Sequence, residues 1–435
     1  MSTRFKRVSV IGGPDARTHA MVCHLIDNSP GVEEIFCAPG SAGIAQERLK
    51  NGKLVTCVPI EVGNIRGHLA LAKEKRLGMT LVGPERPLVR GVRNLFAASG
   101  QRLFGCDKIS AQFEGSKYFA QDFANKHGVR FAPGESFTDK RKARAYARRL
   151  KGRCAVKADG LRNGKGVEIC RSLRKAYAAI DAEFKMPRAK IVIQELLKGR
   201  EVTLMLFCDG KSVKLCETAR DYKRALDGDI GPQTGGVGAY SSDPLLSAEE
   251  LAEIQRTIIG PWLEGCEAEG IVFKGILYIG LMVTKDGIFA LEFNVRLGDP
   301  EAQVLLPRLE NDLLEIADAC LLGTLDRVTL RFKSIHTICV VMSTAGYPKN
   351  PESGQVISGL NMVASRPHFK VFHYGTRRKG DLVLTPSGRS LAVTGWSEKS
   401  LDAAANNVYG AIDRYLEFSG GFYRRDIGEE VWRKL

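Results

Sequence analysis

Long apolar runs are missing from this sequence of 435 residues, since none reaches the ~18 residues that a membrane-spanning helix needs. The first ten residues lack the apolar stretch of a signal peptide. The eleven cysteines are scattered, without a C-x-x-C pair or a Cys/His cluster at zinc-binding spacing. These absences argue against a membrane protein, a disulfide framework and a structural zinc site. We therefore expect a cytoplasmic protein whose thiols are reduced and mostly buried.

Several catalytic and nucleotide-binding signatures are also absent. None of the seven histidines stands in a metal-binding or nucleophile-activating constellation. The glycine-rich turn at 12–15 is not a G-x-G-x-x-G dinucleotide fingerprint. In the stretch 156–167 only three residues separate the first two glycines, and a glycine follows the second lysine, so it is not a Walker A loop. We interpret it as a strand–loop–strand hairpin that can close over phosphates.

Positive charge is abundant, with a net charge of +15 and a pI near 9.3. Such a field favours anionic partners: nucleotides, phosphorylated metabolites or nucleic acid. The densest basic run, residues 140–153, has apolar residues at helical spacing, which predicts an amphipathic helix with a basic outer face. No aromatic residues alternate with the basic ones to stack on bases. We therefore favour a solvated face over a nucleic-acid surface.

The order of apolar runs and turn residues predicts two to four domains. Strands expected at 8–11, 34–38 and 80–82 end at glycine-rich loops and alternate with helices, as in an open parallel α/β sheet. Ligands bind such sheets outside the carboxyl ends of the strands. The glycine-rich stretch 229–240 is too long for a hairpin turn and predicts a functional loop. His373 alternates with apolar neighbours and is interpreted as a core or capping residue.

The stretch 291–297 carries the most specific local signal. On a β-strand Glu292, Asn294 and Arg296 share one face, while Leu291 and the other apolar residues share the opposite face. A carboxylate and an amide oxygen are hard ligands suited to Mg²⁺ or Mn²⁺, and the guanidinium suits a phosphate or carboxylate beside the metal. The alternative is a half-exposed strand with a surface salt bridge, and the pattern alone does not decide between the two.

Five separated motifs, taken together, resemble the phosphoribosylamine–glycine ligase (glycinamide ribonucleotide synthetase) family of the ATP-grasp superfamily. The motifs lie at 83–89, 114–117, 157–160, 231–241 and 291–301. The resemblance covers nearly the whole chain. It implies a multidomain α/β and α+β protein: an ATP-grasp fold with an N-terminal open parallel α/β (pre-ATP-grasp) domain and a C-terminal β-rich domain. The implied division is 1–104 for the N-terminal domain, 105–120 with 193–330 for the catalytic core, 121–192 for the lid subdomain and 331–435 for the C-terminal domain.

The family resemblance implies an ATP-dependent ligase of purine biosynthesis. Glycine is phosphorylated by ATP to glycyl phosphate, and the amine of 5-phosphoribosylamine then displaces phosphate to give glycinamide ribonucleotide. Phosphoryl transfer of this kind needs positioning and charge stabilisation rather than a nucleophilic side chain. The implied partners are glycine, 5-phosphoribosylamine and ATP, with Mg²⁺ or Mn²⁺. Binding to nucleic acid or to membranes is not expected. The protein is expected to be a monomer.

The resemblance also implies roles for individual residues. The implied ATP-binding residues are Lys117 and Lys157 on the phosphates, the lid residues Gly164, Lys165 and Gly166, the adenine hinge Glu195 and Leu197, and Glu201 on the ribose. The implied metal ligands are Glu292 and Asn294. The residues implied at the reacting groups are Asp221, Lys223, Arg224, Arg296 and Asp299. The loops at 12–19, 39–43 and 83–87 would hold the phosphoribosyl group.

The chain departs from the family pattern in its first loop, where Pro14 removes a backbone donor and Thr18 stands in place of a glutamate. At the hinge, Gln194 stands in place of a glutamate. The altered first loop motivates a second hypothesis, an ATP-grasp ligase with a different amine or carboxylate. A third is a non-catalytic, basic nucleotide- or RNA-binding protein, against which the retained Lys157 and Glu292 argue.

Overall fold

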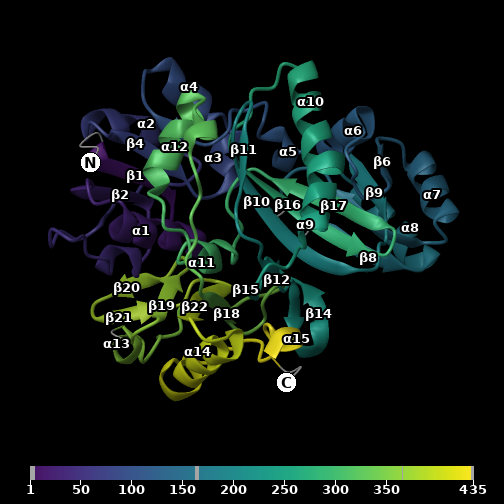
Figure 1. Cartoon of the computed structure of the whole chain (residues 1–435). Coiled ribbons are helices and arrows are strands. Elements are labelled where there is room, and N and C mark those ends of the chain that lie inside the picture. The colour runs from purple at the N-terminus through teal and green to yellow at the C-terminus, as the bar shows by residue number, and fades with distance from the viewer. Residues whose placement is uncertain (1–4, 162–165, 365, 433–435) are drawn as a thin grey trace.

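The N-terminal part of the chain is an open parallel sheet. The structure is a computed structural model that describes residues 5–161, 166–364 and 366–432. The strand order is β3-β2-β1-β4-β5, with every neighbouring pair parallel (Figure 1). The strands are β1 (Arg7–Gly12), β2 (Glu34–Pro39), β3 (Thr56–Cys57), β4 (Met79–Val82) and β5 (Leu103–Phe104). The helices are α1 (Ala16–Asn28), α2 (Ile65–Glu74), α3 (Glu85–Val89) and α4 (Val92–Ala98). The three strands predicted from the sequence are confirmed.

The strands of this sheet read as near-continuous apolar runs because the sheet is covered on both faces. Val8 and Val10 of β1 are fully buried, and so are Met79 and Leu81 of β4. Helix α1 starts at Asp15, whose side chain accepts a hydrogen bond from the Thr18 N–H and caps the helix. The loops that follow β1, β2 and β4 therefore gather at one edge of the sheet.

A small α+β subdomain projects to the right in Figure 1, and we call it the lid. Its sheet has the order β6-β9-β7-β8 and is antiparallel. Its elements are β6 (Gly134–Phe137), α7 (Lys140–Arg149), β7 (Arg153–Ala158), β8 (Val167–Arg171), α8 (Leu173–Glu183) and β9 (Ile191–Glu195). Strands β7 and β8 form the predicted hairpin, whose tip, including Gly164 and Lys165, lies outside the described residues. Helix α7 is amphipathic as predicted, with Ala143, Tyr146 and Ala147 buried.

The central sheet has the order β11-β10-β16-β17 and is antiparallel. Its strands are β10 (Arg200–Asp209), β11 (Val213–Leu215), β16 (Lys274–Thr284) and β17 (Gly287–Asn294). The helical segments beside it are α5 (Gln112–Gly115), α6 (Lys117–His127), α9 (Ala248–Ile254), a π-helical turn η4 (Gln255–Ile259) and α10 (Gly260–Ala268). An aromatic cluster of Phe113, Phe123, Trp262 and Phe293 fills the space between these helices and β17.

The last sheet, at the bottom of Figure 1, has the order β12-β15-β18-β22-β19. Its strands are β12 (Arg220–Asp221), β15 (Gly238–Ser241), β18 (His336–Ser343), β19 (Phe369–His373) and β22 (Arg389–Ser397). Helix α14 (Leu401–Tyr415) packs on β18 and β22. Strands β12 and β15 thus join a sheet whose other strands come from beyond residue 331. His373 is buried at the end of β19, as predicted.

The prediction of a single long loop over 229–240 is wrong. Its first part is β14 (Ile230–Gln233), which pairs with β13 (Arg224–Leu226), and its end is β15. Strand β15 is held by β18, about one hundred residues further along the chain. Val237 and Tyr240 are buried there, so long-range pairing gives this glycine-rich segment its regular structure.

The remaining elements are short, apart from α12, which contacts α1, β5 and β10. They are η2 (Ile44–Gln46), η3 (Asp227–Asp229), α11 (Ala302–Leu305), α12 (Leu313–Leu322), η5 (Leu325–Arg327), α13 (Leu360–Val363), β20 (Arg377–Lys379), β21 (Leu382–Leu384) and α15 (Glu429–Trp432). In the part of the chain that the structure describes, no helix is long and apolar enough to cross a bilayer.

We expect Phe293→Ala to be strongly destabilising. The Phe293 ring lies 5.1 Å from Phe131 and 6.0 Å from Phe113, and truncation leaves a cavity in that cluster. The free energy of unfolding in urea should fall by about 3–5 kcal/mol. Phe289→Ala, on the opposite face of β17 and half-buried, is the matched control and should lose roughly half as much. Equal losses in the two variants would contradict this description of the core.

Candidate functional site

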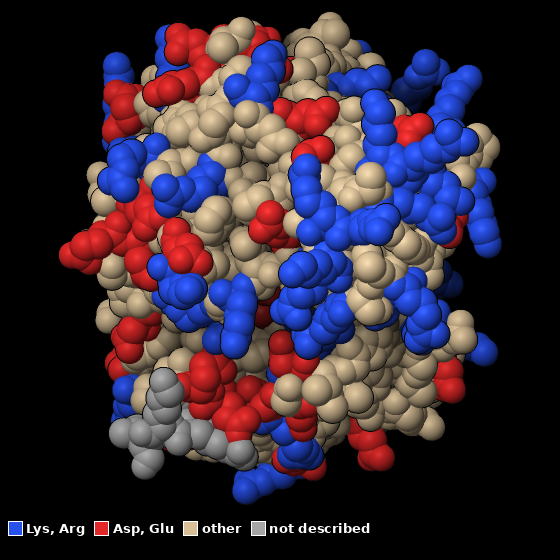
Figure 2. All heavy atoms as spheres, turned by 90° about the vertical axis from the view of Figure 1, so that its right-hand side faces the viewer, with Lys and Arg blue, Asp and Glu red and all other residues tan. Residues whose placement is uncertain are grey.

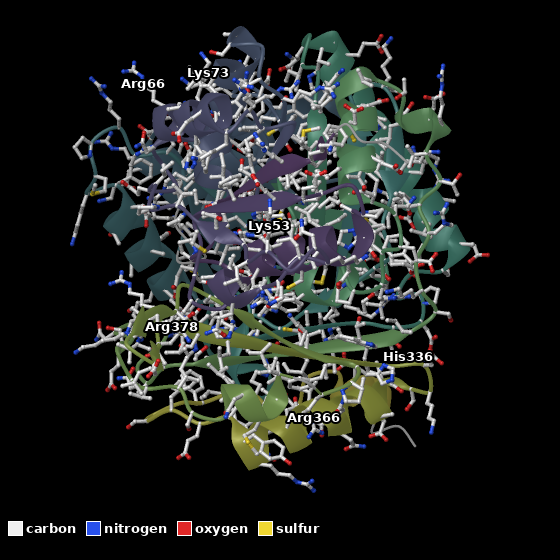
Figure 3. The ribbon with its side chains drawn as sticks, turned by 90° about the vertical axis from the view of Figure 1, so that its left-hand side faces the viewer. Lys53, Arg66, Lys73, His336, Arg366 and Arg378 are labelled. Atoms are coloured by element: carbon white, nitrogen blue, oxygen red, sulfur yellow. The ribbon has the colours of Figure 1, made fainter. Side chains whose placement is uncertain are left out.

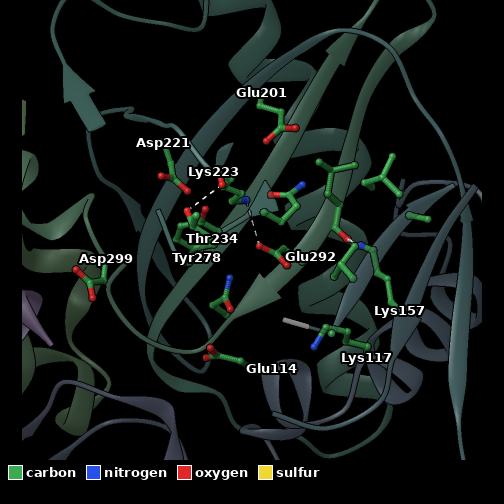
Figure 4. A pocket seen from close by; sticks show the side chains of 18 of the residues that line it. Glu114, Lys117, Lys157, Glu201, Asp221, Lys223, Thr234, Tyr278, Glu292 and Asp299 are labelled. Carbon is green, nitrogen blue, oxygen red and sulfur yellow. Dashed lines mark hydrogen bonds and ion pairs between the residues drawn. The ribbon is translucent and has the colours of Figure 1, made fainter. Parts of the chain in front are cut away.

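A cleft of about 920 Å³ lies between the lid, the central sheet and the last sheet. Residues far apart in the sequence line it, as the close view in Figure 4 shows. Of the residues proposed from the sequence, the structure brings to this cleft Lys117, Lys157, Gly166, Glu195, Leu197, Glu201, Asp221, Lys223, Arg224, Glu292, Asn294, Arg296 and Asp299.

Strand β17 presents Glu292 and Asn294 to the cleft, but the predicted alternation is wrong at Leu291. The register of β17 on β16 slips there: Glu292 faces Gly280, whereas Ala290 faces Leu281. This β-bulge leaves Leu291 unpaired and turns it toward the cleft beside Glu292. Beyond the bulge the alternation resumes, and Phe293 is buried in the core.

Three lysines surround Glu292. The Lys223 ammonium lies 3.5 Å from Glu292 Oε1, and Figure 4 shows Lys117 and Lys157 on the side of the lid. Burial alone would raise the pKa of Glu292, but Lys223, Lys157 and Lys117 lower it to about 2. Glu292 is therefore a carboxylate at neutral pH, in a site with an excess of positive charge.

Lys157 enters the cleft from β7 and donates a hydrogen bond of 2.8 Å to the carbonyl of Leu291. The bulge at Leu291 thus supplies the acceptor that holds this lysine. Burial lowers the pKa of Lys157 to about 8, because desolvation and the neighbouring Lys117 outweigh the attraction of Glu292. Lys117, the first residue of α6, donates to the carbonyl of Gly160 at 3.3 Å.

Arg296 is engaged by carboxylates of the protein. Its Nη2 lies 2.8 Å from Glu114 Oε1 and donates to Asn294 Oδ1 at 3.2 Å, while its Nε lies 3.6 Å from Glu85 Oε2. Burial lowers the pKa of Arg296, but Glu114 and Glu85 raise it by more. The guanidinium therefore orients Asn294 and joins β17 to the N-terminal sheet.

Asp299 connects the cleft to the last sheet. Its Oδ2 lies 3.1 Å from Arg389 Nη2, and its Oδ1 accepts hydrogen bonds from Gln303 and Tyr374. Arg389 also donates to the carbonyl of Gly235 at 2.7 Å. Burial raises the pKa of Asp299, but Arg389 and Arg17, together with the hydrogen bonds from Gln303 and Tyr374, lower it by more. Both oxygens of this carboxylate are bound by protein groups, so Asp299 links its own chain segment to the last sheet.

Strands β12 and β13 and the two residues between them carry Asp221, Lys223 and Arg224. Asp221 Oδ1 is buried and has no hydrogen-bond partner among the described residues. Burial and the nearby Glu301 raise the pKa of Asp221 well above its usual value. Arg224 donates to the carbonyl of Gly231 at 2.8 Å. Asp221 lines the cleft, and its Oδ1 has unused hydrogen-bonding capacity.

The hinge end of the cleft is formed by β9 and the start of β10. Gln194 is buried, and its amide donates to Gln121 Oε1 at 2.8 Å and to the carbonyl of Leu291 at 3.3 Å. Glu195 and Glu201 are exposed at the rim. The protein itself thus fixes the Gln194 side chain.

Comparisons with known proteins identify the family. The models for the N, ATP-grasp (A) and C domains of phosphoribosylglycinamide synthetase match residues 6–114, 115–302 and 337–430. A phosphoribosylamine–glycine ligase of Allochromatium vinosum is 42% identical over 428 residues, which cover 97% of this chain and 98% of that protein. The chain belongs to the phosphoribosylglycinamide synthetase family.

Solved structures agree with this assignment. The crystal structure of a phosphoribosylamine–glycine ligase from Thermotoga maritima superposes with a TM-score of 0.80 at 29% identity, covering 97% of this chain and 100% of that one. A biotin carboxylase from Campylobacter jejuni, with 14% identity and a TM-score of 0.70 over 98% and 94% of the two chains, shares the fold alone. The predicted fold class, an ATP-grasp fold behind a parallel N-terminal sheet, is confirmed.

The donor set on β17 fits the divalent metal that ATP-grasp ligases use. Glu292 offers an ionised carboxylate, and Asn294 offers an amide oxygen that keeps one free lone pair after accepting from Arg296. Both are hard oxygen ligands on a rigid strand. Both side chains face the cleft from the same strand.

The first loop, where the chain departs from its family, is organised by Asp15. Asp15 Oδ1 accepts hydrogen bonds from the Thr18 N–H, the Thr18 hydroxyl and Arg17 Nε. Pro14, Arg17 and Glu85 line the cleft, so the loops at 12–19 and 83–87 reach it. The loop at 39–43 packs against Gly13 but does not line the cleft.

Outside the cleft, His19, Cys23 and Glu47 form a group with the composition of a metal site. Lys370 already binds Glu47 at 2.8 Å, and His19 Nδ1 accepts a hydrogen bond from the His373 N–H. Burial lowers the pKa of His19, so the neutral ring carries its proton on Nε2, toward Glu47. In this arrangement neither ring nitrogen of His19 has a lone pair left for a metal.

Sequence reasoning missed several residues that hold this site. They are Glu85, Glu114, Tyr278, Tyr374 and Arg389. Glu85 and Glu114 lie in two of the family motifs, at 83–89 and 114–117. The sequence does not show that their side chains approach Arg296, because that contact depends on the fold. Arg389 and Tyr374 carry no local signal, because each contacts Asp299 from a strand at least 75 residues further along the chain.

We expect Lys157 in the empty cleft to lose its proton near pH 8. Lysine side-chain ¹³C NMR, with the signal assigned by its loss in Lys157→Arg, measures this titration directly. Because the Glu292 carboxylate raises the pKa of Lys157, Glu292→Gln should move the midpoint lower. Glu264→Gln, at an exposed position on α10, is the control and should leave it unchanged. A midpoint near 10.5, the ordinary value, would contradict the burial argument.

Proposed function

We infer that this chain is an ATP-dependent ligase that joins glycine to 5-phosphoribosylamine, giving glycinamide ribonucleotide, ADP and phosphate in purine biosynthesis. One observation carries the inference: Glu292 and Asn294 face a cleft that also holds Lys117, Lys157 and Lys223, in a chain 42% identical to a phosphoribosylamine–glycine ligase. Oxygen ligands beside buried ammonium groups suit a metal-bound triphosphate.

Lys157 and Lys117 bind the ATP phosphates, and Glu292 and Asn294 hold Mg²⁺ or Mn²⁺ against them. When bound, the metal neutralises charge that develops on the phosphates. Lys157 reaches from β7 to the Leu291 carbonyl, which holds its ammonium beside Glu292. A bound triphosphate raises the pKa of Lys157, so that this lysine stays protonated during the reaction. The lid residues Gly164, Lys165 and Gly166 close over the phosphates.

The adenine lies against the hinge, with Glu195 and Leu197 beside its edge and Glu201 at the ribose. This proposal is supported by their common position at the rim of the cleft, on β9 and the start of β10. Gln194 cannot turn toward adenine without losing its hydrogen bond to Gln121, so backbone groups provide the recognition.

Glycine and the acyl phosphate lie beside Asp221, Lys223 and Arg224. The unpartnered Oδ1 of Asp221 accepts from the ammonium of glycine, and Lys223 neutralises the carboxylate that attacks the γ-phosphate. Arg296 and Asp299 act as positioning residues, since Glu114 and Arg389 already occupy their charged groups. The amine of 5-phosphoribosylamine then attacks glycyl phosphate, forming the C–N bond as phosphate leaves. Arg17 and the loops at 12–19, 39–43 and 83–87 hold the phosphoribosyl group.

We also propose that the protein acts in the cytoplasm as a monomer. The four-part division at residues 104, 120, 192 and 330 remains our proposal for the domains. The family models for the N domain and for the ATP-grasp domain meet at residues 114 and 115.

Purified protein with Mg²⁺ should release ADP from ATP only when glycine and 5-phosphoribosylamine are both present. A coupled ADP assay across a panel of carboxylates and amines measures this. The altered first loop, with Pro14 lining the cleft, is the one feature that favours another amine. Turnover with another pair, and none with glycine and 5-phosphoribosylamine, would show that the second hypothesis is correct.

Glu292→Gln should lower kcat at least about 100-fold, because an ionised metal ligand is lost. It should also raise the Mg²⁺ concentration needed for half-maximal activity. The far-ultraviolet circular dichroism spectrum should not change, since the side chain faces the cleft. Glu264→Gln removes the same charge from the surface of α10 and should leave kcat as it is. Wild-type turnover in Glu292→Gln would show that the metal ligands are elsewhere.

A further inference from the structure

The positive charge of the chain is concentrated in the lid. Residues 121–192 contain 19 lysines and arginines against 7 aspartates and glutamates, a net charge of +12 out of +15 for the whole chain. Figure 2 shows Lys and Arg side chains gathered over this side of the molecule, where α7 and α8 lie in Figure 1. One sixth of the sequence therefore accounts for four fifths of the net charge.

Much of this charge has no acidic partner. On α7, Lys140 and Arg144 share Asp181 of α8 at 2.9 and 2.5 Å, and Arg149 pairs with Glu135 at 2.8 Å. On α7, in the turn that follows it and at the start of α8, the exposed cations that form no ion pair with any acidic residue in the described ranges are Arg141, Lys142, Arg148, Lys151 and Arg174, and we call them the lid basic surface.

The members of the lid basic surface lie on adjoining elements. Arg141 and Arg148 are seven residues apart on α7, so they share a face and are separated by about 10 Å along the axis. Lys151 follows in the turn after α7. That turn packs on the start of α8, where a Cβ on Gly152 would lie 2.2 Å from the Leu173 nitrogen. Arg174 stands next to that contact.

The charges in the first turn of α7 do not serve its stability. That turn contains Lys140, Arg141 and Lys142 and no acidic residue. The helix dipole is positive at that end and favours anions there, so each of these cations opposes it, whereas Arg148 in the last turn is favoured by it. At the N-terminal end the Asp139 cap, which accepts from the Lys142 N–H at 2.8 Å, acts in the stabilising direction. An anionic partner would relieve this repulsion.

The outward face of α7 suits one kind of partner. Apart from Ala145 its exposed residues are all basic, so it offers no large apolar side chain for insertion into a bilayer and no apolar centre for a protein interface. Interfaces with nucleic acid are polar and strongly positive, and arginine binds phosphate oxygens with two parallel hydrogen bonds. We propose that the lid basic surface binds the phosphate backbone of nucleic acid.

This binding does not read sequence. The nearest aromatic rings, Tyr146 and Tyr177, are covered by Arg149 and Arg144, with guanidinium carbons 4.4 and 4.9 Å from the ring centres. No described ring on this face is therefore free to stack on a base. Backbone contacts alone give affinity that falls steeply with salt.

The lid basic surface is separate from the cleft. Ala155 and Lys157 of β7 line the cleft, whereas Cys154 and Val156 point to the other face and pack with α7 and α8. One sheet therefore lies between the two sites. Nucleic acid bound on α7 and nucleotide bound in the cleft do not compete, and this binding is independent of the proposed ligase activity.

Fluorescence anisotropy with labelled duplexes of about 20 base pairs, two sequences each of RNA and DNA, tests the proposal. We expect binding that is insensitive to sequence and to excess Mg·ATP. The double variant Arg141→Glu/Arg148→Glu should weaken it at least about tenfold, and the slope of log K against log salt should become shallower by about 2. The melting temperature of the variant should stay close to that of wild type, because Arg141→Glu places an anion at the helix N-terminus and Arg148→Glu places one near the C-terminus, so their effects through the helix dipole oppose each other.

The matched control is Arg66→Glu/Lys73→Glu on α2. Like Arg141 and Arg148 these residues are the second and ninth of a ten-residue helix, and they are exposed on the other side of the molecule (Figure 3). The control should bind within twofold of wild type, and both variants should keep full ADP release. Equal weakening in the two double variants, loss of binding with Mg·ATP, binding to anionic phospholipid vesicles only, or no binding of the duplexes by wild type would each overturn the proposal.

Discussion

A half-buried carboxylate among ammonium groups is the constraint on which this molecule depends. Lys223 lies 3.5 Å from Glu292, and Lys223 and Lys157 keep that carboxylate ionised. Burial lowers the pKa of Lys223, but Tyr278, Glu292 and the neighbouring carboxylates raise it well above its usual value. An isolated charge in such a place would be costly. The pKa of Lys157 is lowered by burial first, and then by Lys117 and Lys223, which add positive charge to the cleft. The site is therefore arranged for an anion that brings its own counter-charge.

The protein holds this arrangement with ion pairs that cross between its parts. Arg296, two residues after β17, binds Glu114 of α5 and Glu85, the first residue of α3 in the N-terminal part of the chain. Asp299 joins the same chain segment to Arg389 of the last sheet. Breaking a buried pair of this kind leaves an uncompensated charge and is more costly than the pair is stabilising. The segments that form the cleft are thus fixed relative to one another by groups that do not need to touch substrate.

Local sequence patterns predict the elements of this fold well. The parallel strands at 8–11 and 80–82, the hairpin around 160 and the amphipathic α7 each follow from periodicity and turn residues. These features are decided by residues within one turn or one strand. The face of β17 that presents Glu292 and Asn294 to the cleft was also predictable, since these two residues are two positions apart.

What the sequence does not reveal depends on pairing at long range. The bulge at Leu291 is set by the register of β17 on β16, and it decides which carbonyl holds Lys157. Strand β15 is held by β18, and the anchoring of Asp299 comes from Tyr374 and Arg389. None of these partners is close in sequence, so no local pattern encodes them.

The two faces of the lid sheet illustrate different uses of the same charge. Lys157, on the cleft side, is desolvated and fixed by a carbonyl, so salt screens its interaction with a phosphate only weakly. Arg141 and Arg148, on the outer side, are surrounded by water, and their attraction for phosphate decays within a Debye length of about 8 Å at physiological salt. Geometry thus sets affinity in the cleft, whereas ionic strength sets it on α7. A net charge counted over the whole chain combines these regimes, which is why it indicates anionic partners without indicating where or how tightly they bind.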